Sequence, residues 1–308
     1  MGLRIRTNVQ SLVAQRHLTA NQNKAASTMS KLASGHRITK AADDAAGLAI
    51  SESLNADIRS LAQAQRNASD AISMLQVAEG GLQEISNIVV RLKELTIQAA
   101  SDTVGVRERE FLNREFMALK NEIDRIALST DYNGTRLLVG NKEIDPSLAV
   151  SHNYSPLEFQ IGKEYLLPPD SLESPNPVNI IRADFSKMDA SLTGENSLNL
   201  GTPEQEDGTS IISKQQAQRS MIVIEQALEK VASYRASIGA QQNRLDATDR
   251  NLSVSIENLA TAKSRIKDAD FAKETSAFTQ SNVLVQAGAS ILTQANQLPN
   301  VALQLLNQ

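Results

Sequence analysis

The sequence predicts a mainly α-helical protein. A long antiparallel helical coiled-coil rod is built from both chain ends, and a small middle region contains a β-hairpin. Seven of the eight prolines lie between Pro146 and Pro203, so the residues on either side can form long helices. Aromatic residues are only 3% of the 308 residues, which favours thin helix-on-helix packing over a thick core. Apolar residues also recur at every seventh position in both halves, a spacing that requires helical partners.

The clearest repeat lies in the C-terminal half, where eight successive positions spaced by seven are all apolar. This pattern predicts a helix of about 60 residues, roughly 90 Å long. Its narrow apolar stripe requires a partner helix, so we expect these residues to form one side of a buried seam. Besides Ala217, the series contains Ile224, Val231, Ile238, Leu245, Leu252, Leu259 and Ile266.

The N-terminal half carries a matching series, which we expect to form the other side of this rod-core seam. Its members are Leu54, Leu61, Ala68, Leu75, Leu82 and Val89. Gly80 and Gly81 interrupt the predicted helix, and glycine weakens a helix by about 1 kcal/mol relative to alanine, so the sequence allows a local bend here. After Thr103, a shorter helix containing Phe116 is predicted to end at the turn signal Asn133-Gly134.

The middle of the chain, residues 141–207, is expected to hold turns and short strands. Strand-like pieces occur at Val178–Ile181 and at Ser197–Leu200. The sequence therefore divides into an N-terminal coiled-coil part, N-terminal rod helices, a variable outward region, a long C-terminal rod helix and a C-terminal coiled-coil part, with predicted limits 1–43, 44–140, 141–207, 208–270 and 271–308.

Both ends of the chain have unusual charge patterns. Residues 275–308 contain no charged side chain, although a soluble monomer normally covers the outer face of a helix with charge. We interpret this segment as a helix that other copies of the chain bury on most of its sides. Its seven-residue series, which we predict to take part in this assembly, is Leu284, Ile291, Leu298 and Leu305.

Residues 1–42 contain seven basic residues and no acidic ones. One interpretation is a basic arm for a membrane surface or a nucleic acid. The other, which also accounts for the uncharged C-terminal end, is a segment that orders only on assembly, with neither a nucleic acid nor a membrane as partner. No secretory signal or membrane-spanning apolar run is recognisable, which fits a cytoplasmic protein or export without a cleaved signal.

Catalytic motifs are not found in the sequence. It has no cysteine, its three histidines are far apart, and no phosphate-binding glycine loop or nucleophile elbow occurs. Adjacent residues do not share a helix face, so Asp43 and Asp44 are expected to have a capping or surface-pairing role rather than to act as paired catalytic carboxylates. We therefore expect no enzyme activity, no cofactor and no metal site.

Several long motifs resemble those of the bacterial flagellins. In the N-terminal part they are Thr7–Leu12, Lys31–Ile38, Ala42–Ile50 and Asn121–Ile126, and in the C-terminal part they are Glu257–Ile266, Asp268–Ala272, Gln286–Gly288 and Gln294–Asn300. The resemblance covers about residues 1–140 and 208–308. A related alternative is the hook-filament junction protein of the same superfamily, but this typically has proline at the position of Ala45.

The resemblance implies a subunit that polymerises into the flagellar filament and is exported unfolded by the flagellar type III route. The two chain ends would pair along an axial channel, and the middle would face outward. The implied partners are other copies of the chain, an export chaperone on the C-terminal helix, and the filament cap and hook-filament junction proteins.

A second surface is predicted on the N-terminal helix, opposite its seam. On a helical wheel with Val89 at zero, Leu95 lies between 180° and 240°, as do its neighbours Arg91 and Gln98, which suggests an exposed contact between neighbouring rods. The resemblance implies a further role, because Arg91, Leu95, Gln98 and Glu115 match positions at which the flagellin-sensing Toll-like receptor binds.

Overall fold

The computed structural model of the chain describes residues 8–140, 156–163, 179–185, 188–193, 197–201 and 209–306, with side chains up to residue 297. Two compact units are present. The terminal unit combines residues 1–58 with 257–308, and the central unit comprises residues 59–256. The predicted fold class is confirmed, because long helices from both halves of the chain dominate the structure and strands occur only in short antiparallel pairs.

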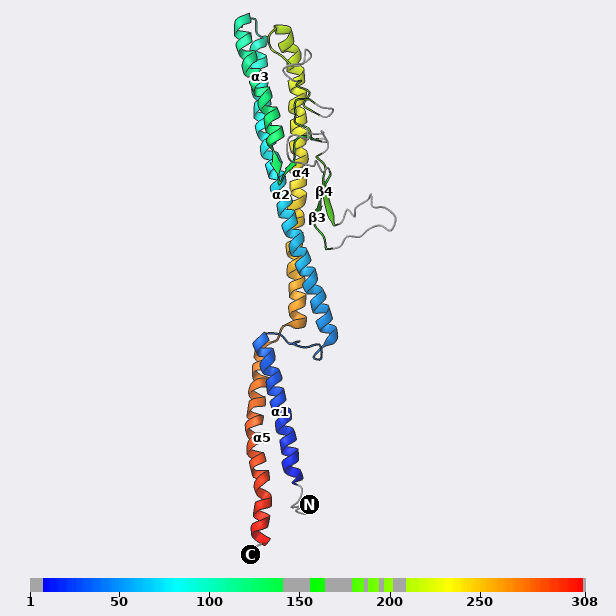
Figure 1. Cartoon of the computed structure of the whole chain (residues 1–308), viewed down its shortest axis with the longest axis vertical. Helices are drawn as coiled ribbons and strands as arrows, with labels where there is room; N and C mark the ends of the chain where they lie inside the picture. Colours follow the sequence, from blue (N-terminus) through cyan, green and yellow to red (C-terminus); the bar gives the residue numbers. More distant parts are fainter. Residues whose placement is uncertain are drawn as a thin grey trace, which may run out of the picture. The chain divides into compact units, whose positions relative to one another are not determined.

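The terminal unit is organised around two antiparallel helices, α1 (Val9–Ser34) and α5 (Phe271–Leu306), which lie side by side (Figure 1). Asn8 caps the start of α1 by accepting a hydrogen bond from the backbone N–H of Ser11. At the other end, Gly35 adopts the left-handed conformation, with φ of 70°, that commonly ends a helix.

Two short linkers in the terminal unit are hydrogen-bonded to each other. Between α1 and α2 (Ala45–Ala100), the Arg37 backbone N–H donates to the carbonyl oxygen of Lys267, at 2.7 Å. In return, the Ala269 N–H donates to the carbonyl oxygen of Gly35 at 2.9 Å. Of the two adjacent carboxylates, Asp44 caps α2 by accepting a hydrogen bond from the N–H of Gly47 in its first turn, whereas Asp43 accepts hydrogen bonds from the backbone N–H groups of Thr39 and Lys40 in the linker.

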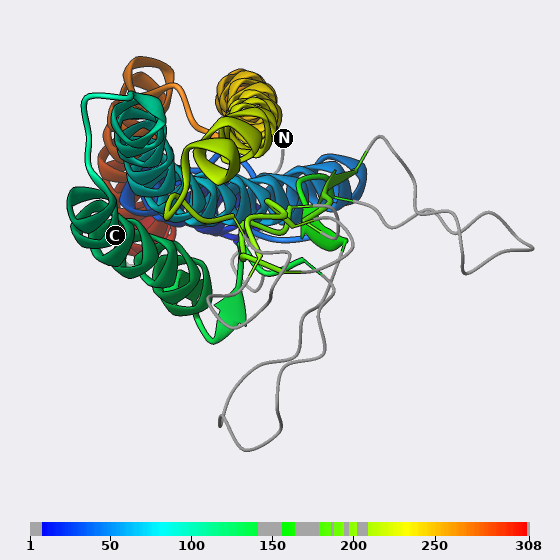
Figure 2. The same ribbon diagram turned by 90° about the horizontal axis from the view of Figure 1, so that it is seen from above.

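The central unit contains the greater part of α2, together with α3 (Val106–Ser129) and most of α4 (Lys214–Lys267), whose helices run beside one another (Figures 1 and 2). The predicted seam residues of this unit are buried between α2 and α4. These are Leu61, Leu75, Leu82 and Val89 on α2 and Ile224, Val231, Ile238, Leu245 and Leu252 on α4. The remaining seam residues belong to the terminal unit, where Leu54, Leu259 and Ile266 are half-buried.

The helix α2 continues without a break through its glycine pair. Gly81 allows a close approach at this point, since a Cβ atom there would lie 2.7 Å from Thr130 Oγ1 and 2.8 Å from Leu138 Cδ1. Thr130 and Leu138 flank the predicted turn. The predicted turn at Asn133-Gly134 joins β1 (Asp131–Tyr132) to β2 (Thr135–Arg136) in a hairpin, and both turn residues have positive φ angles.

The described part of the middle region contains one antiparallel pair, β3 (Leu157–Gln160) and β4 (Ile180–Ala183). Strand β4 overlaps the predicted strand-like piece Val178–Ile181, of which Val178 itself lies outside the described residues. The other prediction is wrong, because residues 197–200 form no strand. Instead, Leu198 and Leu200 are buried in the central core while Asn199 takes a left-handed φ of 56°, which interrupts an extended conformation.

Lys120 on α3 holds this middle segment against the helices. Its side chain is fully buried, and Nζ donates hydrogen bonds to the carbonyl oxygens of Leu200 (2.7 Å) and Thr209 (3.2 Å). The ring of Phe116 lies beneath the ammonium group, with 5.9 Å between the ring centroid and Nζ. Because burial removes water from the charge, the pKa of Lys120 falls from 10.5 to about 8.

We expect the burial of Lys120 to make the stability of the central unit depend on alkaline pH. The pKa of Lys120 is lower in the folded than in the unfolded state, so burial of the charged ammonium group destabilises the folded protein. This destabilisation is fully present below pH 8 and declines as the pH rises towards 10.5. From pH 7.5 to 9.5, the free energy of unfolding of the wild type should rise relative to that of Lys120→Met by about 2 kcal/mol. Denaturant unfolding of both proteins at the two pH values measures this, and parallel pH profiles would contradict it.

Candidate functional site: the paired terminal helices

Small and polar residues form the contact between α1 and α5. Ser281 and Ala295 of α5 are almost fully buried, and Gly288 lies between them at the same seven-residue spacing. A Cβ atom on Gly288 would lie 3.3 Å from Cδ1 of Leu18 and 3.9 Å from its Cα, so the two helix backbones approach closely here. On α1, Thr28 is buried in the same contact. The pair is therefore held by close backbone packing rather than by large side chains.

Hydrogen bonds fix the register of this helix pair near its end. Asn8 Nδ2 donates to the carbonyl oxygen of Ala295 at 2.7 Å, and Ser11 Oγ donates to Oδ1 of Asn296 at 2.7 Å. The buried hydroxyls of Thr28 and Ser281 donate to carbonyl oxygens one turn earlier in their own helices. The polar groups at this contact thus have partners, as burial requires.

Several large apolar side chains of both helices stay exposed beside this contact. Val9, Leu12 and Val13 of α1 and Val283 of α5 are exposed, as are two of the predicted assembly residues, Leu284 (42% exposed) and Ile291 (56% exposed). The other two, Leu298 and Leu305, lie on α5 with side chains outside the described residues.

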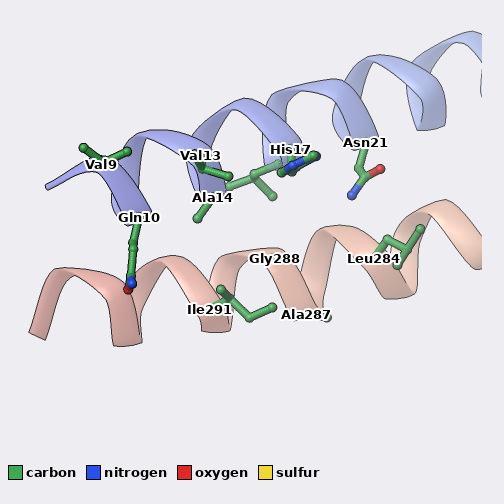
Figure 3. A pocket seen from close by; sticks show the side chains of 11 residues that line it. Val9, Gln10, Val13, Ala14, His17, Asn21, Leu284, Ala287, Gly288 and Ile291 are labelled. Atoms are coloured by element: carbon green, nitrogen blue, oxygen red, sulfur yellow. The ribbon is translucent and has the colours of Figure 1, made fainter. Parts of the chain in front are cut away.

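Some of these side chains enclose an apolar groove of about 460 Å³ between α1 and α5, which Figure 3 shows from close by. Val9 and Val13 line it on α1, and Leu284 and Ile291 line it on α5. Gln10, His17 and Asn21 supply its polar edges. An exposed apolar groove in a helix pair held mainly by small residues is suited to receiving side chains from another molecule.

The described carboxylates of the terminal unit lie in the linkers, on the adjoining ends of α2 and α4 and in the first turn of α5, and none lines the groove. Lys267 of α4 pairs with Glu52 of α2 at 2.9 Å, and this hydrogen bond lowers the pKa of the Glu52 carboxyl. Hydrogen bonds from Thr39 and Lys40 lower the pKa of Asp43. These contacts stabilise the connection between the helices and leave the groove without a nearby carboxylate.

The structure corrects the expectation for the second predicted surface. Leu95 is fully buried, because α3 packs against the face of α2 that the helical wheel places opposite the seam. Arg91 and Glu115 do come together, with Arg91 Nε and Nη2 donating to Glu115 Oε1 at 3.0 and 2.8 Å, and Gln98 is exposed. The apolar stripe of α3, which includes Phe116 and Ile123, was the signal that this face of α2 is covered.

Neither membrane-spanning helices nor metal-binding clusters stand out in the described ranges. Their helices all fall short of the length and apolarity that crossing a bilayer requires. No group of three or more histidine, aspartate or glutamate residues gathers there in a way that could hold a metal ion.

Comparison with known proteins accounts for both ends of the chain. Residues 5–143 match the family model of the bacterial flagellin N-terminal helical region, and residues 221–306 match that of the C-terminal helical region. The chain is 39% identical to a flagellin of Bacillus subtilis, in an alignment that covers 99% of the chain and all of the relative. It is 36% identical to the flagellar filament 33 kDa core protein of Treponema phagedenis, covering 98% of the chain and 99% of the relative.

The fold also resembles a solved structure, that of a putative flagellar hook-associated protein from Vibrio parahaemolyticus. The TM-score is 0.53 with 14% sequence identity, covering 73% of this chain and all of that chain. At this identity the likeness concerns the fold alone. The two family models and the near-complete alignments show that the chain is a member of the bacterial flagellin family.

Proposed function

We propose that this flagellin is the structural subunit of an extracellular flagellar filament, and that copies of the chain bury the exposed apolar surface of α1 and α5 against one another. The relatives support the role, since one is named as a core protein of the flagellar filament. The function is structural, so no substrate or cofactor is involved.

The observation that carries the proposal is the exposure of large apolar residues on α1 and α5. Leu284, Ile291 and Val283 are exposed on a segment without any charge, while the contact inside the unit uses small residues. Burial stabilises by about 25 cal/mol for each Å² of apolar surface, and identical copies can supply that surface repeatedly. A head-to-tail contact that does not close produces a helical filament.

The predicted export and assembly partners are part of this proposal. Type III export of an unfolded chain suits terminal helices that gain most of their burial from neighbouring copies. An export chaperone would cover α5 before assembly, and the filament cap and hook-filament junction proteins would contact the same exposed surface at the two ends of the polymer. The alternative, a hook-filament junction protein, would use this surface for a single ring of subunits.

The surface around Arg91 would contact neighbouring subunits, the Toll-like receptor, or both. Arg91, Gln98 and Glu115 are available for such contacts, whereas Leu95 contributes only by supporting α2 against α3. The pairing of Arg91 with Glu115 and Glu94 presents a fixed set of charges on this side of the central unit.

Ile291→Asp tests the proposal. The substitution places a charge in the exposed apolar surface, where burial by another copy would remove water from it at a cost of several kcal/mol. We expect no filaments by electron microscopy at concentrations where the wild type polymerises fully. The thermal unfolding of the central unit should be unchanged.

Ile291→Leu is the matched control, because it keeps the apolar character and volume of the side chain and should still polymerise. Normal filaments from Ile291→Asp would contradict the proposed role of this surface. A ring rather than a filament formed by the wild type would favour the junction protein.

A further inference from the structure

We infer that the two linkers of the terminal unit form a joint that closes when a chain adds to the filament, and that a chain contributes its α1 and α5 to the polymer only with this joint closed. The linkers are residues 35–44, between α1 and α2, and residues 268–270, between α4 and α5. The inference rests on the proposed function, because it assigns to the linkers the step that fixes α1 and α5 for assembly.

Three hydrogen bonds tie the first linker to the end of α4 and to the second linker. The Arg37 backbone N–H donates to the carbonyl oxygen of Lys267, and Nη2 of the same residue donates to that of Ile266, both at 2.7 Å. The Ala269 N–H donates to the carbonyl oxygen of Gly35 at 2.9 Å. The two carbonyl groups that receive Arg37 belong to the last turn of α4, where no partner exists inside the helix and a cation is favoured.

His36 and Asp268 face each other at the centre of this contact, as partners in an antiparallel bridge. The hydrogen bonds of the bridge come from the residues on either side, so this is a non-hydrogen-bonded pair, in which the Cα atoms are about 4.5 Å apart. Nδ1 of His36 lies 3.3 Å from Oδ1 of Asp268, so the two side chains project from the same face.

Ile38 anchors the first linker to α2. It is 2% exposed, and its side chain lies against Gly47 in the first turn of α2, where a Cβ atom would be 2.9 Å from Ile38 Cδ1. The same Cβ atom would be 2.8 Å from Cγ of Asp44, the residue that caps α2. Residues 37 and 38 thus tie the linker to α4 and to α2, and closing the joint sets α1 and α5 relative to the adjoining ends of those helices.

The joint is held by few groups. Ile38 is the one buried residue among the two linkers, all of whose residues the structure describes, and hydrogen bonds contribute modestly where water competes for the same atoms. Such a segment opens readily in a single chain. In the polymer, burial of the α1 and α5 surfaces between copies keeps it closed, so the cost of ordering the linkers is part of the cost of assembly.

A disulfide between positions 36 and 268 tests the inference by closing the joint before assembly. The chain has no cysteine of its own, and the Cα separation expected for this pair suits a disulfide. For His36→Cys/Asp268→Cys, we expect oxidation to lower the critical concentration of full-length chains on filament seeds at least about tenfold relative to the reduced form. His36→Cys alone cannot form the cross-link and should show no such fall on oxidation.

Gly47→Ala opens the joint from the side of α2, because the added methyl group displaces Ile38 and the capping carboxylate of Asp44. Loss of an N-cap of this kind should raise the critical concentration about 2- to 30-fold. Gly80→Ala is the matched control on the same helix. A Cβ atom at Gly80 meets nothing within 4 Å, so this variant should stay within about threefold of the wild type.

Several results would overturn the inference and leave the proposed function intact. These are oxidised chains that no longer add to seeds, a critical concentration that oxidation does not change, and a cysteine pair that does not cross-link in the polymer. Equal critical concentrations for Gly47→Ala and Gly80→Ala would overturn it as well. Absence of polymer from the wild type would contradict the proposed function and the inference with it.

Discussion

Leu95→Asp should lower the free energy of unfolding of the central unit by at least about 4 kcal/mol. The Leu95 side chain is fully buried where α3 covers α2, in the same apolar cluster as Phe116 and Leu92. The substitution removes apolar contacts and places a carboxylate among apolar neighbours. Denaturant unfolding followed by circular dichroism measures the loss.

Gln98→Asp provides the comparison for Leu95→Asp, since it introduces the same side chain at an exposed position one turn away on α2. We expect this variant to stay within about 0.5 kcal/mol of the wild type. If Leu95→Asp were as stable as Gln98→Asp, the packing of α3 over this face would be contradicted, and the exposed contact expected from the helical wheel would be restored.

Gly288→Leu should weaken polymerisation strongly, because the larger side chain cannot fit against Leu18 without separating α1 from α5. Overpacking of this kind costs about 1–3 kcal/mol, which raises the critical concentration about 5- to 150-fold. The hydrogen bond from Asn8 to Ala295, at 2.7 Å, should be weakened by the same separation. Sedimentation of polymer at a series of protein concentrations gives the critical value.

Gly288→Ala distinguishes size from helix propensity. Its single methyl group would meet Leu18 Cδ1 at 3.3 Å, which a small side-chain shift can relieve, and alanine favours the helix by about 1 kcal/mol over glycine. We expect polymerisation within about threefold of the wild type. A defect in the alanine variant as large as that of leucine would show that flexibility at this position, rather than close packing, is what matters.

Periodic sequence features predicted the long helices well. The apolar series containing Leu75 and Leu82 on α2 and Ile238 and Leu245 on α4 is buried as expected, because a seven-residue repeat can be buried only against another helix. The hairpin at Asn133-Gly134 was also predictable, since both of its central residues need positive φ angles.

Other features depend on which elements meet in space, and the sequence does not show this directly. Leu95 looked exposed because the wheel of α2 says nothing about where α3 packs. The pairing of the chain ends was expected from the resemblance, but the residues that make the α1/α5 contact were not identified, because Ser281, Gly288 and Ala295 are small residues that an apolar pattern does not pick out. The pattern found Leu284 and Ile291 instead, which are exposed at the groove beside the contact, where the proposed assembly needs them.

The same lack of a visible signal applies to Lys120. A lysine in an amphipathic helix normally faces solvent, and only the positions of the Leu200 and Thr209 carbonyl oxygens explain why this one is buried. The central unit thus uses the charged side chain of Lys120 to hold the backbone at Leu200 and Thr209, whose packing position the sequence pattern does not predict.

The central claim is that the outward surface of α1 and α5 is buried between copies of the chain. The chain contains no cysteine, so Leu284→Cys introduces a single thiol at a position that is 42% exposed. Maleimide labelling of this variant before polymerisation, after polymerisation and after dissolving the polymer measures the burial directly. We predict rapid labelling in the first and third states and at least tenfold slower labelling in the polymer. Equally rapid labelling of the intact polymer would contradict the claim.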